Sequence, residues 1–187
     1  MLLISIIATI TRGIWALFEF VRRLREPPHK GKFHDKYSSQ LWDLAIGLEL
    51  IGMIGGFIGL GRLHFGTVVI PIIGLMLLIL GIAIRWTAIY TLGKYFTGKV
   101  LIQPDQQLIR KGLYRYVRHP AYAGSLLAHV GLGLSFSSWF TLAFSAIPFV
   151  IAVWYRMRVE DEALHQAFGV AYLDYSKRAK RLIPKLY

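Results

Sequence analysis

The chain has 187 residues, of which 55% are hydrophobic, and it combines a mean hydropathy of +0.49 with a net charge of +12. This composition argues against a soluble domain, which must present a charged surface, and it predicts an integral membrane protein with its basic residues on one side. Cysteine is absent, which excludes a disulfide framework, a thiolate nucleophile and a cysteine metal site.

Five apolar segments are near the length of about 20 residues that a helix needs to cross a bilayer. They are Leu2–Val21, Leu41–Leu60, Val68–Tyr90, Ala121–Phe136 and Trp139–Tyr155. The last two are separated by only two serines, which predicts a tight helical hairpin. The expected fold class is therefore an all-α integral membrane protein of about five transmembrane helices, and residues 1–90 hold the first three.

Lysine and arginine gather in segments 22–36, 94–118 and 156–185, whereas the loop after the second span has only Arg62. The positive-inside rule then predicts an outside N-terminus, with the two long polar segments and the C-terminal tail in the cytoplasm. Because this topology explains the basic residues, we expect the lipid bilayer, and not nucleic acid, as the partner.

Several charged residues fall within the predicted spans, where an unpaired charge is costly. Arg12 lies near mid-depth of the first span and Glu49 near mid-depth of the second, so we expect them to face each other. Glu19 and Arg85 lie near the cytoplasmic ends of their spans, where they can pair or extend to the membrane surface.

The stretch Gly112–Gly124, just before the predicted hairpin, is dense in groups that can hold a ligand. Pro120 disfavours a helical conformation at His119, so a helix is predicted to start directly after it. His119 would then lie at a helix N-terminus, where backbone N–H groups favour an anionic ligand group. A basic, aromatic anchor at the lipid headgroups is an equal alternative on these residues alone. The ligand-competent residues are Tyr114, Arg115, Tyr116, Arg118, His119 and Tyr122.

Three consecutive acids, residues 160–162, follow the last predicted span. On a continuing helix Arg156 and Glu160 share one face, as do Arg158 and Glu162, because each pair is four residues apart. Ordinary surface ion pairs are the alternative interpretation. The predicted hairpin brings these acids to the same side of the membrane as the stretch Gly112–Gly124.

Two patterns, in this order, resemble the isoprenylcysteine carboxyl methyltransferase family over about the C-terminal half. The first is Gln106-Gln-Leu-Ile-Arg-Lys-Gly112-Leu-Tyr114-Arg-Tyr-Val-Arg118-His119-Pro120-Ala-Tyr122-Ala-Gly124. The second, after the hairpin, is Arg156-x-x-x-Glu160-Asp161-x-x-Leu164…Phe168-Gly169-x-x-Tyr172-x-x-Tyr175…Ile183-Pro184.

The resemblance implies a membrane methyltransferase that uses S-adenosylmethionine to methylate a lipophilic carboxylate, such as the C-terminal carboxyl of a prenylcysteine. Residues 91–187 would form the catalytic half, with a cytoplasmic cofactor pocket between the loop before the hairpin and the tail after it. Arg156 and Glu160 would be the catalytic residues, with Arg156 binding the substrate carboxylate through its planar fork. The cofactor-binding residues implied are Gln106, Gln107, Leu108, Ile109, Tyr114, His119, Pro120, Ala121, Tyr122 and Glu160.

Methyl transfer to a carboxylate needs neither a metal nor a general base, so we expect catalysis by orientation and desolvation. In one departure from the family, Gln106 stands where some members have histidine. Glutamine does not titrate near neutrality, which argues against an acid–base role at this position.

Three alternatives remain open at this stage. Sterol-type reductases that use NADPH have a similar C-terminal pattern, but this chain is short and has Ala171-Tyr172 where a tryptophan is expected. A lipid amine or thiol is a second possible methyl acceptor. The non-enzymatic alternative is a membrane protein whose basic cytoplasmic face binds anionic lipids.

Overall fold

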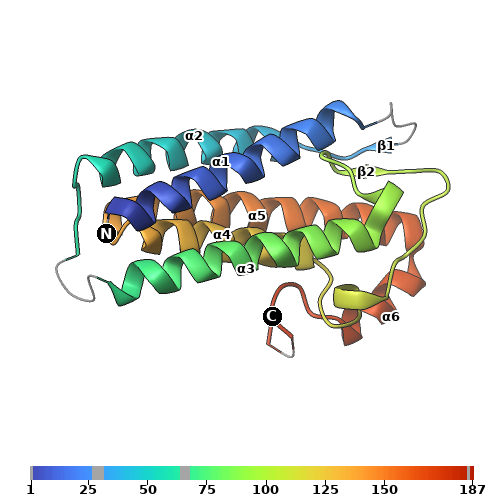
Figure 1. Cartoon of the computed structure of the whole chain (residues 1–187). Coiled ribbons are helices and arrows are strands. Elements are labelled where there is room, and N and C mark those ends of the chain that lie inside the picture. The colour runs from blue at the N-terminus through green and yellow to red at the C-terminus, as the bar shows by residue number, and fades with distance from the viewer. Residues whose placement is uncertain (1, 27–31, 64–67, 185) are drawn as a thin grey trace.

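The structure, a computed structural model, describes residues 2–26, 32–63, 68–184 and 186–187. Residues 27–31 and Lys185, which belong to the predicted basic segments, lie outside the described residues. The long helices lie side by side, and the short elements gather at one end of the bundle (Figure 1). In chain order the elements are α1 (Leu2–Leu24), β1 (Lys32–Phe33), α2 (Ser38–Phe57), α3 (Val69–Leu92), the 3₁₀ helix η1 (Gly93–Tyr95), β2 (Leu101–Ile102), the 3₁₀ helix η2 (Gly112–Arg115), α4 (Pro120–Ser135), α5 (Trp139–Phe168) and α6 (Val170–Arg178).

The all-α membrane fold predicted from the sequence is confirmed. In the described part of the chain, four helical stretches are long and apolar enough to cross a membrane: Leu2–Leu24, Ser38–Phe57, Val69–Tyr95 and Trp139–Phe168. The remaining predicted span corresponds to α4, which has 16 residues. At about 1.5 Å per residue α4 is roughly 24 Å long, shorter than a hydrocarbon core of about 30 Å.

Glycines allow α3 and α4 to approach at backbone distance. A Cβ atom added at Gly81 would lie 2.4 Å from the Ala128 nitrogen and 2.5 Å from the Gly124 carbonyl oxygen. A Cβ atom at Gly131 would lie 2.3 Å from the Leu78 nitrogen. Such small-residue contacts are the usual means by which membrane helices pack closely. They bring α4, which carries His119 at its N-cap, against α3.

We expect Gly81→Ala to lower the free energy of unfolding by about 1–3 kcal/mol, because the added methyl group meets backbone atoms that cannot move separately. Gly47→Ala is the matched control, since a Cβ atom there has nothing within 4 Å. Thermal unfolding in detergent measures both variants. Equal unfolding temperatures would contradict the close approach of α3 and α4.

Buried ion pairs connect α1 to the rest of the bundle. Arg12 Nη2 lies 2.7 Å from Glu49 Oε2, which confirms the predicted pairing, and His129 Nδ1 lies 2.7 Å from the other Glu49 oxygen. Arg85 Nε lies 2.6 Å from Glu19 Oε1, so these two residues also pair. Because only three α1 residues are buried, these ion pairs supply a large part of its attachment.

The C-terminal tail packs against the segment that precedes α4. The Arg118 N–H donates to the Lys180 carbonyl at 2.6 Å, and the His119 N–H donates to the Arg181 carbonyl at 3.0 Å. The predicted fifth span ends at Tyr155, but α5 continues to Phe168, because its polar extension still favours helix. The loop, the α5 extension and the tail therefore meet at the same end of the bundle (Figure 1).

Candidate active site

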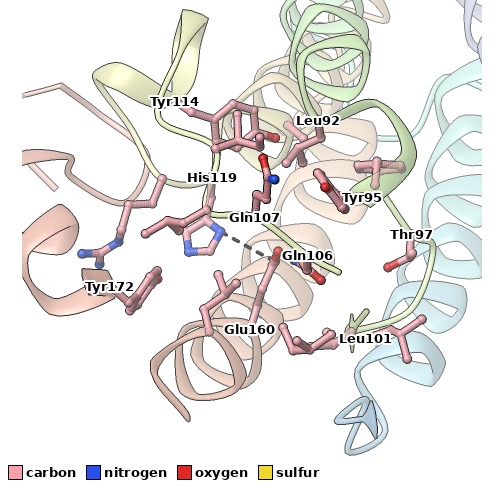
Figure 2. A pocket seen from close by; sticks show the side chains of 18 of the residues that line it. Leu92, Tyr95, Thr97, Leu101, Gln106, Gln107, Tyr114, His119, Glu160 and Tyr172 are labelled. Carbon is pink, nitrogen blue, oxygen red and sulfur yellow. Dashed lines mark ion pairs between the residues drawn. The ribbon is translucent and has the colours of Figure 1, made fainter. Parts of the chain in front are cut away.

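A narrow cavity with a free volume of about 80 Å³ lies between the loop that follows α3 and the ends of α5 and α6. Figure 2 shows residues from these elements around it. Nine of the ten predicted cofactor-binding residues, and the predicted substrate-binding arginine, line it: Gln106, Gln107, Leu108, Ile109, Tyr114, His119, Ala121, Tyr122, Glu160 and Arg156. The tenth, Pro120, is buried at the first position of α4, where it fixes the start of the helix.

His119 lies between two carboxylates of α5. Its Nε2 is 2.8 Å from Asp161 Oδ1, its Nδ1 is 3.6 Å from Glu160 Oε2, and its side chain is almost fully buried. The structure confirms that a helix starts directly after His119. However, an imidazole that faces two acids is poorly placed to receive an anionic group, and its position suits orientation of the neighbouring carboxylates.

Asp161, to which the sequence interpretation gave no role, connects several residues around the cavity. It accepts hydrogen bonds from His119, from the Tyr172 hydroxyl, from Arg181 Nε at 3.0 Å and from Arg118 Nη2 at 3.4 Å. One carboxylate thus joins the start of α4, the α5 extension, α6 and the tail. The sequence offered one signal for Asp161, which is that it directly follows Glu160 in the second pattern.

Glu160 presents an unsatisfied acceptor at the cavity. Its Oε2 atom is buried and has no hydrogen-bond partner among the described residues. The carboxylate points toward His119 in Figure 2, where a dashed line joins the two side chains. Buried polar atoms nearly always have a partner, so an unsatisfied carboxylate oxygen in a cavity points to a ligand with a cationic or hydroxyl donor.

Arg156 is buried and joins four parts of the chain. Its Nε donates to the Tyr122 hydroxyl at 2.9 Å, its Nη1 to Ser38 Oγ at 3.2 Å and its Nη2 to the Gly98 carbonyl at 2.5 Å. The Asp35 carboxylate lies 3.7 Å from Nη1. A guanidinium has five N–H groups, so two are left by these three hydrogen bonds, and the one on Nη1 is also near the Asp35 carboxylate.

A second cavity, with a free volume of about 450 Å³, adjoins the first. Arg156 and Tyr122 line both cavities, so they form part of the wall between them. Cationic side chains outnumber acidic ones in the lining of the second cavity, which favours an anionic ligand group. Its other basic residues are Arg22, Arg23, Arg85 and Lys99, and its acidic residues are Glu26 and Asp43.

Two tyrosines of the first cavity stay neutral. Burial raises the pKa of Tyr114 well above its usual range and raises the pKa of Tyr175 to about 12. The Tyr175 hydroxyl donates to the Tyr114 carbonyl at 2.7 Å, which holds α6 on η2. These phenols therefore present aromatic faces and no charge to the cavity.

Gln106 and Gln107 enter the cavity from the extended loop between β2 and η2. Gln106 Oε1 accepts from the Gln103 N–H at 3.0 Å, so this side chain stabilises its own loop. Among the described residues, no group of three or more histidine, aspartate or glutamate side chains is arranged to hold a metal ion.

Comparisons with known proteins agree on one family. The model of the isoprenylcysteine carboxyl methyltransferase (ICMT) family matches residues 73–166. Protein-S-isoprenylcysteine O-methyltransferase B of Arabidopsis thaliana is 35% identical over 117 residues, which cover 59% of this chain and 57% of that protein. The protein-S-isoprenylcysteine O-methyltransferase of Saccharomyces cerevisiae is 29% identical over 124 residues, which cover 63% and 50% of the two chains. This chain thus spans between half and three-fifths of the length of these two relatives.

A solved structure of the eukaryotic intramembrane Ras methyltransferase ICMT has the same fold, with a TM-score of 0.64 and 24% sequence identity. The similarity covers 79% of this chain and 53% of that one.

Proposed function

Because this chain belongs to the isoprenylcysteine carboxyl methyltransferase family, we propose that it is a membrane methyltransferase that uses S-adenosylmethionine. Its acceptor is a lipophilic carboxylate, such as the C-terminal carboxyl of a prenylcysteine. The observation that carries this proposal is the unsatisfied Glu160 carboxylate in a cavity whose wall includes Arg156. Family membership favours this activity over the sterol-type reductase alternative.

The residues of the first cavity fit the cofactor. S-adenosylmethionine combines a sulfonium and an ammonium with a carboxylate, ribose hydroxyls and adenine, and when bound it supplies an electrophilic methyl group. Glu160 Oε2 lacks a donor and would receive the ammonium or a ribose hydroxyl. The aromatic faces of Tyr114 and Tyr172 suit a cation or a base. Gln106, Gln107, Leu108 and Ile109 would hold the cofactor from the loop side.

The loop between β2 and η2 must move outward for this binding. Ligand pockets have volumes of about 300 Å³ or more, whereas the first cavity has about 80 Å³. Residues 103–111 of the loop have no helix or strand to hold them. We therefore assign closure over the cofactor to this loop.

The second cavity suits the acceptor. Arg156 lies in the wall between the two cavities, and its free N–H groups can hold one oxygen of a carboxylate while leaving the other reactive. A carboxylate is already ionised at neutral pH, so the chain needs only to orient it and exclude water. Asp161 holds His119 and the C-terminal tail in place beside the first cavity.

The proposal also assigns a membrane orientation to the chain and a separate role to each of its two halves. The basic segments orient the polar end of the bundle toward the cytoplasm and the N-terminus outward. Residues 91–187 form the catalytic half, and residues 1–90 form three membrane helices. The first half also contributes Ser38 to Arg156 and Arg85 to the second cavity.

Calorimetry on purified protein in detergent, with S-adenosylmethionine and NADPH added separately, tests the cofactor. We expect micromolar binding of S-adenosylmethionine alone and its loss in a folded His119→Ala variant. Binding of NADPH alone would favour a reductase, and failure of folded protein to bind either would favour the non-enzymatic lipid-binding alternative. Transfer of labelled methyl to N-acetyl-S-farnesylcysteine, compared with a long-chain amine and a long-chain thiol, then identifies the acceptor class.

A further inference from the structure

A groove on the lipid-facing surface, distinct from the two cavities of the proposed active site, runs between α1 and α3. The part of this groove that lies further from the polar end of the bundle has a volume of about 450 Å³ and is almost entirely apolar. The residues that line this part are Thr11, Ile14, Trp15, Phe18, Ile82 and Trp86. Phe18 and Trp86 also line a space of about 590 Å³ nearer the polar end, so the two spaces adjoin, and together we call them the α1–α3 groove.

The end of the α1–α3 groove near the polar end of the bundle is basic. Arg22, Arg25 and Lys94 line it, with Glu26 as its acidic residue. Arg22 is held by ion pairs to Glu19 and Glu26, whereas no ion pair joins Arg25 to an acidic residue in the described ranges. Lys94 pairs with Asp105, but both side chains are more than half exposed, so this pair is weak. Arg25 and Lys94 are therefore available for an external anion.

The length of the apolar part matches one leaflet of a bilayer. Along α1 the groove extends ten positions from Thr11 to Val21, directly before Arg22, and ten helical positions rise about 15 Å. Each leaflet contributes half of a hydrocarbon core of about 30 Å, which is also about 15 Å. Tyr90, which is 89% exposed, lies beside the basic end, where amphipathic aromatic side chains meet lipid headgroups.

A wall of side chains separates this groove from the second cavity. Arg22, Glu26 and Phe96 line both spaces. The Arg22 guanidinium pairs with Glu26 and lies 4.7 Å from the centre of the Phe96 ring, so the three side chains form one cluster. The groove is therefore a site in its own right beside the acceptor cavity.

We propose that the α1–α3 groove binds one anionic phospholipid of the surrounding membrane. Arg25 and Lys94 hold its phosphate, and one acyl chain lies against Phe18 and Trp86. The positive charge at the basic end of the groove selects an anionic headgroup. The apolar part accepts an acyl chain that is as long as one leaflet is deep. Each cation near the membrane surface contributes about fivefold to such binding.

The test uses protein reconstituted in phosphatidylcholine nanodiscs, into which phosphatidylglycerol with brominated acyl chains is titrated. Bromine quenches tryptophan on contact, and the difference between the native chain and Trp86→Phe gives the Trp86 signal. We expect half-maximal quenching at a several-fold lower mole fraction for brominated phosphatidylglycerol than for brominated phosphatidylcholine. Arg25→Gln and Lys94→Gln should each raise that mole fraction about fivefold.

Arg158→Gln is the matched control, because Arg158 is an exposed cation on α5 that lies 3.7 Å from the Trp154 ring and outside this groove. It should leave the quenching of Trp86 unchanged. Equal quenching by the two lipids, or an equal effect of Arg158→Gln and Arg25→Gln, would overturn the proposal. Displacement of the brominated lipid by N-acetyl-S-farnesylcysteine would also overturn it, because the groove would then belong to the acceptor.

Discussion

Glu160→Gln is expected to weaken the binding of S-adenosylmethionine about 10- to 100-fold, the usual range for a hydrogen bond to a charged group. The substitution keeps the shape of the side chain and removes the charge from a carboxylate whose buried Oε2 atom has no hydrogen-bond partner among the described residues. A neutral amide also brings an N–H₂ group toward a cationic donor, which adds repulsion. Calorimetric titration of both proteins in the same detergent measures the ratio of dissociation constants.

Glu162→Gln is the matched control for Glu160→Gln. It removes the same charge two residues further along α5, but Glu162 is exposed and pairs with Lys36 at the surface. Its dissociation constant should be unchanged. Repeating the titrations with 5′-methylthioadenosine, which lacks the amino-acid part of the cofactor, distinguishes an ammonium partner from a ribose partner. An unchanged affinity in Glu160→Gln would refute the proposed pocket.

The sequence predicted the membrane helices well because apolar runs and hydrocarbon thickness are both local properties. The predicted span ends at Tyr155, but α5 continues to Phe168, since a helix can leave the membrane without a change of conformation. This difference affects the site, because the extension carries Glu160 and Asp161 as one rigid element against the start of α4.

The glycines between α3 and α4 were not singled out from the sequence. Gly74 and Gly81 are seven residues apart, as are Gly124 and Gly131, so the spacing was visible as a signal. Which helix each pair faces depends on the tertiary arrangement, which the spacing alone does not specify.

Most of the residues that the sequence interpretation placed at the site line the cavity, but their contacts were not predicted. The Asp161 partners Tyr172 and Arg181 and the Arg156 partners Ser38 and Gly98 come from distant segments. Hydrogen bonds between such segments leave no periodic pattern in a single chain. They change the interpretation of Arg156, which orders the wall between the cavities besides the ligand-binding role that we propose for it.

Arg156→Lys is therefore expected to lower turnover about 100-fold or more, because a one-ångström misplacement of a bound reactant has effects of this size. Lysine keeps the positive charge but cannot donate to Tyr122, Ser38 and Gly98 from one planar group and still hold a carboxylate. The affinity for S-adenosylmethionine should change by less than about threefold, since the carboxylate proposed to receive its donors is that of Glu160. Initial rates with N-acetyl-S-farnesylcysteine and calorimetry on the same preparations measure the two effects.

Arg158→Lys makes the same chemical change two residues away, at an exposed position of α5, and should leave turnover and cofactor affinity unchanged. The unfolding temperature separates the two roles of Arg156. Loss of turnover at a native unfolding temperature would mean that its free N–H groups act on the acceptor. If turnover, cofactor affinity and unfolding temperature all fall together, the guanidinium acts as a structural link among α2, α4, α5 and the loop. The acceptor carboxylate must then be held by another cation of the second cavity, such as Arg23 or Lys99.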